Sequence, residues 1–269
     1  MHNPEVKRII KLGRKKHRDA AGQFIIEGLH LIDMALVAQA PIACVYHTEA
    51  FAETEPGSAI LTKLAGRSVS INTVTSGVLK KMADTETPQG ILAVVDMLKV
   101  LDWDLHMQGG PFVILDRIQD PGNLGTILRT ADSAGANGVI LLTGTVDAYN
   151  PKVIRSSMGS IFNVPFCQNM SFVQAYKMLK RADYTLTAAD MGGEMLYYKT
   201  KIDQRTALVM GNEGQGIADD IIECIDVSVR IPLIGKSESL NVSVACGILL
   251  YEILRQNRIG QDRPKPASL

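Results

Sequence analysis

The chain has 269 residues, of which 46% are hydrophobic, and its 28 basic residues balance its 28 acidic residues. This length and composition exclude a disordered chain and predict one large hydrophobic core or two modest ones. A net charge of zero gives no sign of a nucleic-acid partner. The amino terminus is too polar for a secretory signal, and every apolar run is shorter than the about 20 residues of a membrane-spanning helix. We therefore expect a folded, soluble, cytoplasmic protein.

The first segment of the chain is locally basic although the whole chain is neutral. Only Glu5 precedes Asp19 among the acidic residues, whereas the basic side chains of the segment are Lys7, Arg8, Lys11, Arg14, Lys15, Lys16, His17 and Arg18. Such a cluster can neutralise several phosphates of a nucleic acid. A solvated terminal helix is the alternative, and it is the more frequent outcome for an isolated basic run.

From residue 23 to residue 96, short apolar runs alternate with helical patterns, which predicts an α/β domain. The expected strands are FII, ACVY, VSIN and GILAVV, and the expected helices cover about residues 29–39 and 58–65. The following stretch, 97–110, is less regular and ends in a Gly-Gly-Pro turn, which favours a hinge. We predict one domain over 1–105 and a second over 106–269.

The second domain contains strands of near-continuous apolar character, which is typical of parallel strands that are buried on both faces. The expected strands cover 112–116, 138–142, 184–189, 206–210 and 227–231. Helical patterns fit between them, near 124–134, 151–157, 172–181 and 217–224, and a long helix near 240–257 closes the domain. The pattern predicts a parallel sheet with helices between its strands.

The four cysteines argue against a metal centre. Cys44, Cys167, Cys224 and Cys246 are scattered along the chain without a CxxC pair. No group of histidines and cysteines has the spacing of a zinc site. The cysteines are typical of reduced, mostly buried thiols in a cytosolic protein, and we expect no bound metal.

The turn DPGNLG, residues 120–125, follows a predicted strand and opens a helix. Its glycine spacing does not match GxGxxG and no acidic ribose ligand ends the next strand, so a nicotinamide-dinucleotide site is disfavoured. Asn123 stands at the helix entrance, where it can orient donors toward an anion or a hydroxyl group. Arg129 lies further along this helix and can make a bidentate phosphate contact, the alternative being a surface salt bridge.

Two further blocks have the composition of binding loops. MGNEGQGI, residues 210–217, places three glycines around Glu213 directly after a buried strand, so that the backbone can turn sharply and approach a ligand closely. In IPLIGKSESLN, residues 231–241, Ser239 and Asn241 stand at the entrance of the long helix, where capping side chains converge. Taken alone, this third block equally fits an ordinary capped core helix.

In this order, the three blocks resemble the SpoU/TrmH family of RNA ribose 2'-O-methyltransferases, within the SPOUT superfamily. The resemblance covers 111–256, and the matching residues are Asn123, Arg129, Gly211, Glu213, Ile231, Ser239, Leu240 and Asn241. It implies S-adenosylmethionine (AdoMet) as the cofactor and a homodimer as the assembly. It also implies an α/β fold in which a parallel-sheet SPOUT domain ends in a C-terminal deep trefoil knot. Residues 24–36 and 87–95 resemble the smaller, L30e-like α/β substrate-binding domain that often precedes it.

The resemblance implies roles for individual positions. The catalytic set is Asn123, Arg129, Glu213, Ser239 and Asn241. The cofactor-binding set is Thr187, Gly211, Ile231, Leu233 and Leu240. The RNA-binding set is Arg14, Lys15, Lys16, Arg18, Lys152 and Arg155, although the last two equally fit solvated helix charges. The general base is left unassigned, because a guanidinium pKa above about 12 argues against Arg129 in that role.

The predicted reaction is methyl transfer from AdoMet to a ribose 2'-hydroxyl of RNA, with ribosomal RNA favoured over transfer RNA. Because the methyl donor is already activated by its positive charge, positioning should supply much of the rate. The alternative from another class is a noncatalytic RNA-binding or ribosome-assembly factor that retains the fold. The intact motif residues argue against that alternative, and the departures from the family pattern, Asn212 and Leu233, are mild.

Overall fold

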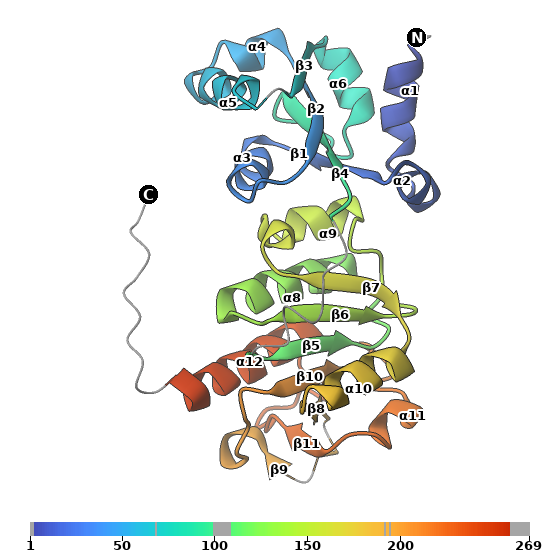
Figure 1. The fold of residues 1–269 in the computed structure, drawn as a ribbon, viewed down its shortest axis with the longest axis vertical. Helices are drawn as coiled ribbons and strands as arrows, with labels where there is room; N and C mark the ends of the chain where they lie inside the picture. The colour runs from blue at the N-terminus through green and yellow to red at the C-terminus, as the bar shows by residue number, and fades with distance from the viewer. Residues whose placement is uncertain (1–2, 68, 99–108, 191, 194, 259–269) are drawn as a thin grey trace. The chain divides into compact units, whose positions relative to one another are not determined.

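The computed structural model describes residues 3–67, 69–98, 109–190, 192–193 and 195–258 (Figure 1). These residues form two compact units, each of which combines separate stretches of the chain. The first unit takes the described residues of 1–101, 119–129 and 146–165, and the second takes those of 102–118, 130–145 and 166–269. Most of the expected hinge, and the predicted boundary after residue 105, lie outside the described residues.

The first unit is built on a four-stranded mixed sheet. In spatial order its strands are β1 (Gln23–Glu27), β4 (Ile91–Asp96), β2 (Ile42–His47) and β3 (Ser70–Thr73). β4 pairs antiparallel with β1 and β2, whereas β2 and β3 are parallel. These strands match the four apolar runs of the sequence, which confirms the α/β character of this region.

The first unit also contains helices. They are α1 (Pro4–Lys11), α2 (Lys15–Ala21), α3 (Leu29–Val37), α4 (Glu49–Ala52), α5 (Glu55–Ala65), α6 (Ser76–Met82), the first part of α8 (Pro121–Ala134), α9 (Pro151–Ser156) and η1 (Ser160–Phe162). Apolar residues at helical spacing give α1 one buried face, on which Val6 and Ile9 join a core that includes Tyr46 and Leu92. Lys7, Arg8 and Lys11 of the basic segment therefore belong to a helix whose apolar face is packed in the core.

Arg18 lies inside the first unit and not on its surface. Its side chain is 4% exposed, and its Nη2 donates to Oδ2 of Asp147 over 2.5 Å. Its Nη1 donates to the carbonyl oxygens of Leu12 and Gly13, at 2.9 Å each. Because this guanidinium is buried and bonded within the protein, the prediction that Arg18 contacts RNA is wrong. The ion pair instead joins α2 to the segment that precedes α9.

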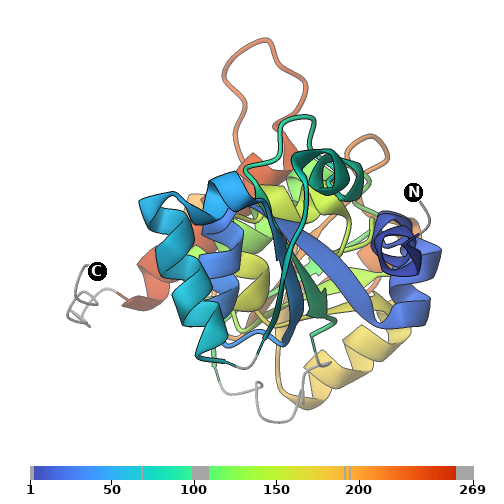
Figure 2. The same ribbon diagram turned by 90° about the horizontal axis from the view of Figure 1, so that it is seen from above.

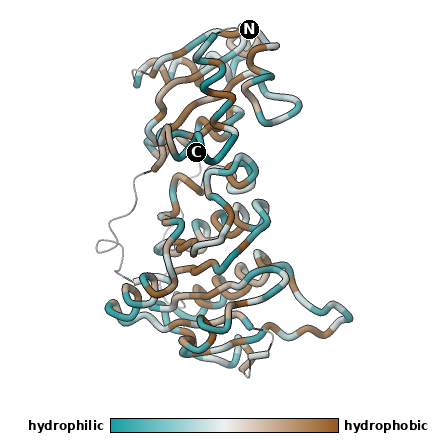
Figure 3. Tube along the Cα trace, turned by 90° about the vertical axis from the view of Figure 1, so that its right-hand side faces the viewer, coloured by the Kyte–Doolittle hydropathy of each residue, from teal (hydrophilic) through white to brown (hydrophobic). Residues whose placement is uncertain are grey.

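The second unit contains a seven-stranded sheet in which every neighbouring pair is parallel. In spatial order its strands are β7 (Phe166–Met170), β6 (Gly138–Leu142), β5 (Phe112–Leu115), β10 (Thr206–Met210), β8 (Thr185–Ala189), β11 (Val227–Arg230) and β9 (Met195–Leu196). Hydrophobic residues follow the strands of this sheet, as Figure 3 shows. The parallel pairing that was predicted for five of these strands is confirmed, and β5, β6 and β10 are buried along their whole length. β8 is buried at its three middle residues, whereas β11 is buried only at Val229.

β7 and β9 are strands that the sequence pattern does not reveal. β7 carries Gln168 and Asn169 in the sequence FCQNM, so it lacks a continuous apolar run. β9 has only two residues and pairs with β11 at the edge of the sheet. Edge strands are covered on fewer sides than central ones, and their sequences are correspondingly less apolar.

The remaining helices belong to the second unit. They are the last part of α8, α10 (Phe172–Arg181), η2 (Tyr197–Lys199), α11 (Asp219–Ile222) and α12 (Val242–Arg258). α12 contacts β10, β8 and η2. A Cβ atom added at Gly247 of α12 would lie 3.5 Å from Cγ2 of Thr130, so α12 approaches the last part of α8 closely. None of the helices in the described parts of the chain is both long and apolar enough to cross a membrane.

The cysteines are free thiols, as the sequence predicts. Cys167 and Cys246 are buried, whereas Cys44 and Cys224 are half-buried. Burial raises the pKa of Cys167 and that of Cys246 to about 12. Neither buried thiol is therefore ionised at neutral pH, and neither has the thiolate character of a catalytic nucleophile.

We expect Asp147→Asn to lower the free energy of unfolding by about 3–5 kcal/mol, because it leaves the Arg18 guanidinium buried without its counter-charge. Urea denaturation at pH 7 measures the change. Asp19→Asn is the control, since it removes the exposed partner of Lys15 and should cost less than about 1 kcal/mol. Equal, small losses in the two variants would contradict a structural role for the buried pair.

Candidate active site

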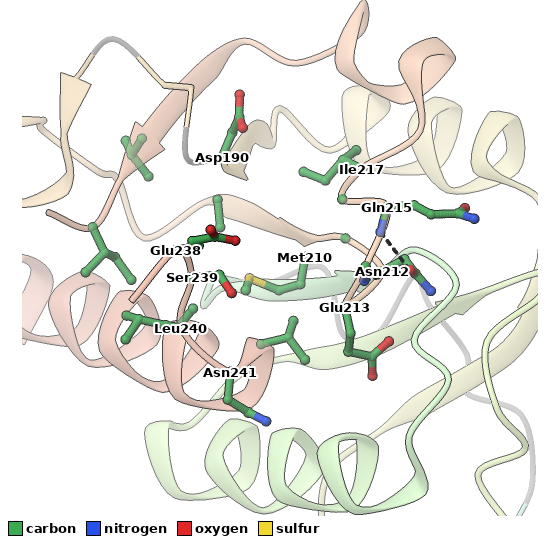
Figure 4. A pocket seen from close by; sticks show the side chains of 18 of the residues that line it. Asp190, Met210, Asn212, Glu213, Gln215, Ile217, Glu238, Ser239, Leu240 and Asn241 are labelled. Carbon is green, nitrogen blue, oxygen red and sulfur yellow. Dashed lines mark hydrogen bonds between the residues drawn. The ribbon is translucent and has the colours of Figure 1, made fainter. Parts of the chain in front are cut away.

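A cavity of about 700 Å³ lies in the second unit at the carboxyl ends of its central strands. β8 leads into Asp190, β10 into the 210–217 turn, and β11 into the 231–241 loop, and all three segments line the cavity (Figure 4). Open parallel sheets bind ligands at this edge, and the volume is within the range of small-molecule sites. The fold therefore brings the second and third sequence blocks to one ligand-sized space.

The 210–217 turn is closed by its own hydrogen bonds. Asn212 and Gly216 exchange backbone N–H···O bonds of 2.9 and 3.0 Å. Oδ1 of Asn212 also accepts from the backbone N–H groups of Gly214 and Gln215, at 2.9 and 3.0 Å (Figure 4). The mild departure from the family pattern at Asn212 thus has a structural use, because its side chain holds the turn that carries Glu213.

Asp116 and Arg117, at the end of β5, anchor this turn from outside. The Asp116 carboxylate, whose side chain is 4% exposed, accepts from Nε and Nη2 of Arg117 at 2.9 Å each and from the backbone N–H of Ala218 at 2.9 Å. Asn212 Nδ2 donates to the Arg117 carbonyl oxygen at 2.8 Å. Hydrogen bonding to Asp116 raises the pKa of Arg117, so the guanidinium stays charged. Neither residue was predicted from the sequence, although a charged pair directly after a buried strand is a signal that could have identified them.

The position of Gly211 has no room for a side chain. A Cβ atom at this position would lie 2.3 Å from the Gly216 carbonyl carbon and 2.4 Å from the Ile217 nitrogen, far inside van der Waals contact. At Gly214, by contrast, the nearest heavy atom would be 3.8 Å away. The two ends of the turn therefore touch at Gly211, which lines the cavity without a side chain.

The 231–241 loop forms the opposite wall of the cavity and leads into α12; Figure 2 shows it as a long projecting loop. Asn241 caps α12, because its Oδ1 accepts from the backbone N–H and the hydroxyl of Ser243 at 2.9 and 2.6 Å. Leu233 and Leu240 line the cavity and are each 37% exposed. Apolar side chains that remain this exposed inside a cavity suit the face of a flat, apolar ligand group.

The predicted cofactor and catalytic residues separate into three groups. Gly211, Glu213, Ile231, Leu233, Ser239, Leu240 and Asn241 all line the cavity. Thr187 is 2% exposed within β8, and the cavity is lined instead by the carboxyl end of that strand, at Ala189 and Asp190. Asn123 and Arg129 belong to α8, in the part of that helix that the first unit includes. Two lining residues, Asp190 and Glu238, were not predicted from the sequence.

α8 begins at Pro121, three residues earlier than expected, so Asn123 lies within its first turn. The Asp120 carboxylate accepts from the Asn123 backbone N–H at 2.9 Å, as a helix cap does. This hydrogen bond, together with Lys152, lowers the pKa of Asp120. Asn123 is half-buried and Arg129 is exposed, and both take part in further interactions of the folded chain.

The remaining basic candidates lie on the surface of the first unit. Arg14, Lys15 and Lys16 are exposed around the start of α2, where Lys15 pairs with Asp19. On α9, Lys152 pairs with Asp120 at 3.2 Å, and Arg155 pairs with Asp84 at 2.5 Å. The described residues contain no group of three or more side chains that could hold a metal ion.

Two protein-family models match this chain, one in its first part and one in its second. Residues 110–251 match the SpoU rRNA Methylase family, and residues 3–93 match the MRM3-like substrate binding domain. Among curated proteins, the chain is 35% identical over 253 residues to the 23S rRNA (guanosine(2553)-2'-O)-methyltransferase RlmP of Bacillus subtilis, a match that covers 93% of this chain and 96% of the relative.

Two further relatives agree with this match. The chain is 29% identical over 264 residues to the 23S rRNA (uridine(2479)-2'-O)-methyltransferase of Streptomyces viridochromogenes, covering 95% of this chain and 90% of that protein. It also resembles the crystal structure of an AdoMet-bound rRNA methyltransferase from Sinorhizobium meliloti, with a TM-score of 0.85 and 32% identity over 95% of each chain.

We expect Gly211→Ala to lower the free energy of unfolding by about 1–3 kcal/mol, because its added methyl group must displace the backbone at Gly216. Gly214→Ala is the matched control in the same turn, where the methyl group has room and the change should stay within about 0.5 kcal/mol. Urea denaturation of both variants measures the difference. A Gly211→Ala protein as stable as the control would show that the turn is loosely packed at this position.

Proposed function

This chain belongs to the SpoU rRNA methylase family, and from that premise we propose that it transfers the methyl group of AdoMet to a ribose 2'-hydroxyl of ribosomal RNA. The observation that carries the proposal is the cavity, which gathers the glycine turn and the 231–241 loop at the carboxyl edge of the parallel sheet. The AdoMet-bound neighbour, alike over 95% of each chain, supports AdoMet as the cofactor. The two 23S rRNA relatives support ribosomal RNA as the substrate.

The cavity offers a suitable surface for each part of AdoMet. Because Gly211 has no side chain, polar atoms of the ligand can approach its backbone closely. Leu233 and Leu240 supply apolar walls for the adenine ring. Ile231, which follows β11, adds to these walls. We assign no cofactor contact to the buried side chain of Thr187. When bound, AdoMet supplies a methyl group that is already activated by the sulfonium charge.

The protein therefore accelerates the reaction mainly by positioning the target ribose beside the methyl donor. In the proposed reaction, Arg129 and Asn123 bind the phosphate and the 2'-hydroxyl of the target nucleotide, because a guanidinium fork matches phosphate geometry. Glu213, Ser239 and Asn241 orient the reacting groups. Since Oδ1 of Asn241 already caps α12, this residue acts through its Nδ2 donors. No residue is assigned as the general base.

RNA binding is proposed for the exposed basic residues of the first unit. Arg14, Lys15 and Lys16 stand around the start of α2, within the region that matches a substrate binding domain. Lys152 and Arg155 extend the set through α9, where each has an exposed acidic partner that a phosphate can displace at modest cost. We keep 1–105 and 106–269 as the proposed domains, the first for substrate binding and the second for catalysis.

A trefoil knot, a homodimer and a cytoplasmic location complete the proposal. The knot is supported by the strand order, in which β10 lies between β5 and β8 and α12 packs against β10 and β8. The homodimer is supported by apolar side chains on the surface of α12, where Val244 is 51% and Tyr251 is 49% exposed. The location follows from a ribosomal RNA substrate in bacteria, the source of the named relatives.

Methyl transfer tests the proposal directly. Labelled AdoMet is incubated with ribosomal RNA that lacks the modification, and the nucleosides are then analysed. We expect a 2'-O-methylated nucleoside with the intact protein, and a fall of about 100-fold or more in kcat/KM for Arg129→Ala with little change in AdoMet affinity. Arg181→Ala, an exposed arginine on α10, is the control.

Three outcomes separate the alternatives. Transfer by the intact protein and loss in Arg129→Ala support the proposed roles. Normal turnover of Arg129→Ala together with an inactive Asn123→Ala would remove the central role of Arg129. Absence of AdoMet binding by the intact protein would overturn the methyltransferase and favour a noncatalytic RNA-binding factor.

Light scattering tests the proposed homodimer. Light scattering at assay concentration should give twice the chain mass of 29.2 kDa. Because a charge on α12 would be desolvated in the proposed interface, Val244→Arg should shift the mass to that of one chain. Val173→Arg on α10, where Val173 is 58% exposed, should remain dimeric. A single-chain mass for the intact protein would remove the homodimer.

A further inference from the structure

The charged side chains that line the cavity are all acidic. Asp190, Glu213 and Glu238 line it, and among the described lining residues there is no lysine, arginine or histidine. Most of the other lining positions are glycines or apolar residues. A wall that carries three carboxylates favours a ligand that is itself positively charged.

Two of these carboxylates, Asp190 and Glu238, reach the cavity wall from different segments of the chain. Asp190 is half-buried at the end of β8, where its backbone N–H donates to the Val229 carbonyl oxygen at 3.0 Å. Its Oδ1 accepts from the Gly192 N–H at 3.1 Å, which fixes the side chain. Glu238 comes from the 231–241 loop, and Figure 4 shows its carboxylate directed into the cavity. Glu213 already has a proposed catalytic role, whereas Asp190 and Glu238 have none.

The reaction removes one methyl group and the sulfonium charge from the cofactor and leaves its other groups unchanged. Transfer breaks the bond between sulfur and the methyl carbon, whose electron pair stays on sulfur, and forms a bond between that carbon and the ribose 2'-oxygen. The hydroxyl proton leaves to water. AdoMet carries a sulfonium, an ammonium and a carboxylate, whereas the product, S-adenosylhomocysteine, has a neutral thioether in place of the sulfonium. The two molecules share every other group that the cavity can contact.

We propose that Glu238 and Asp190 make the cavity select the cationic methyl donor over its neutral product. The inference rests on the proposed function, because it requires AdoMet to bind here. Each carboxylate attracts the sulfonium through space, so its contribution is lost once the methyl group has been transferred. The product is then held by the shared adenosine and amino-acid contacts alone, which favours its exchange for a new donor.

Solvent screening limits how strongly each carboxylate can favour AdoMet over S-adenosylhomocysteine. Charges in a solvent-accessible cavity interact far more weakly than charges in a dry interior, and salt weakens them further. We therefore expect each carboxylate to change the relative affinity for donor and product by about 3-fold to 10-fold, and the effect to shrink as ionic strength rises.

Titration calorimetry of the full chain with AdoMet and with S-adenosylhomocysteine tests the proposal. The variants are Glu238→Gln and Asp190→Asn, which keep the shape of the side chain and remove its charge. Asp183→Asn is the matched control: it removes a carboxylate at the opposite end of β8, and asparagine tolerates the positive φ of 58° there. Sinefungin, whose amine replaces the methyl sulfonium with another cation, serves as a third ligand.

The expected result is a loss of AdoMet affinity in Glu238→Gln and Asp190→Asn with nearly unchanged product affinity, so that the ratio of the two dissociation constants moves by about 3-fold to 10-fold. Sinefungin should follow AdoMet, and the control should keep the ratio of the intact protein. Equal losses for both ligands, or an unchanged ratio, would overturn charge selection. Failure of the intact protein to bind AdoMet at all would instead overturn the proposed function.

Discussion

The cavity depends on the buried carboxylate of Asp116. This side chain binds the Arg117 guanidinium on one side and the backbone N–H of Ala218 on the other, and so it ties the end of β5 to the residue that follows the glycine turn. A buried charge that lost its partners would be costly, so these bonds restrict where the turn can lie. Within that frame, Asn212 closes the turn and the tight packing at Gly211 excludes any side chain.

A second buried charge organises the first unit. The pair of Arg18 and Asp147 joins α2 to the segment before α9, and ring contact between Phe24 and Tyr149, with centroids 4.7 Å apart, reinforces the junction. Two separate stretches of sequence are thereby held in one compact unit that also contains the first part of α8. In the proposed reaction, the surface that binds RNA and the helix that carries Arg129 belong to the same unit, which favours positioning of the target ribose.

Much of the fold is predictable because buried parallel strands have a strong signature. The runs at 112–116 and 206–210 are apolar throughout most of their length and match β5 and β10 closely. β7 escapes detection because two consecutive polar residues, Gln168 and Asn169, interrupt its apolar run, and β9 is too short for any periodic pattern. The start of α8 is displaced because the cap is formed by the Asp120 side chain, which propensity alone does not locate.

Within the candidate site, only the residues that belong to a recognisable sequence motif could be predicted. The glycine turn and the 231–241 loop are recognised by composition, and the fold brings them to one cavity. Arg18 is misjudged because a buried arginine and an exposed one look alike within a basic run; only the distant Asp147 distinguishes them. Asp190 and Glu238 are missed for a similar reason, since their shared role arises from strand order and not from any local pattern.

The central claim is that AdoMet occupies the cavity at the carboxyl edge of the parallel sheet. Amide hydrogen exchange of the full chain, measured with and without saturating AdoMet, tests it most directly. The account predicts slower exchange at 211–217 and 231–241, and unchanged exchange in β1 to β4 of the first unit. Protection confined to other segments, in a protein that demonstrably binds AdoMet, would contradict it.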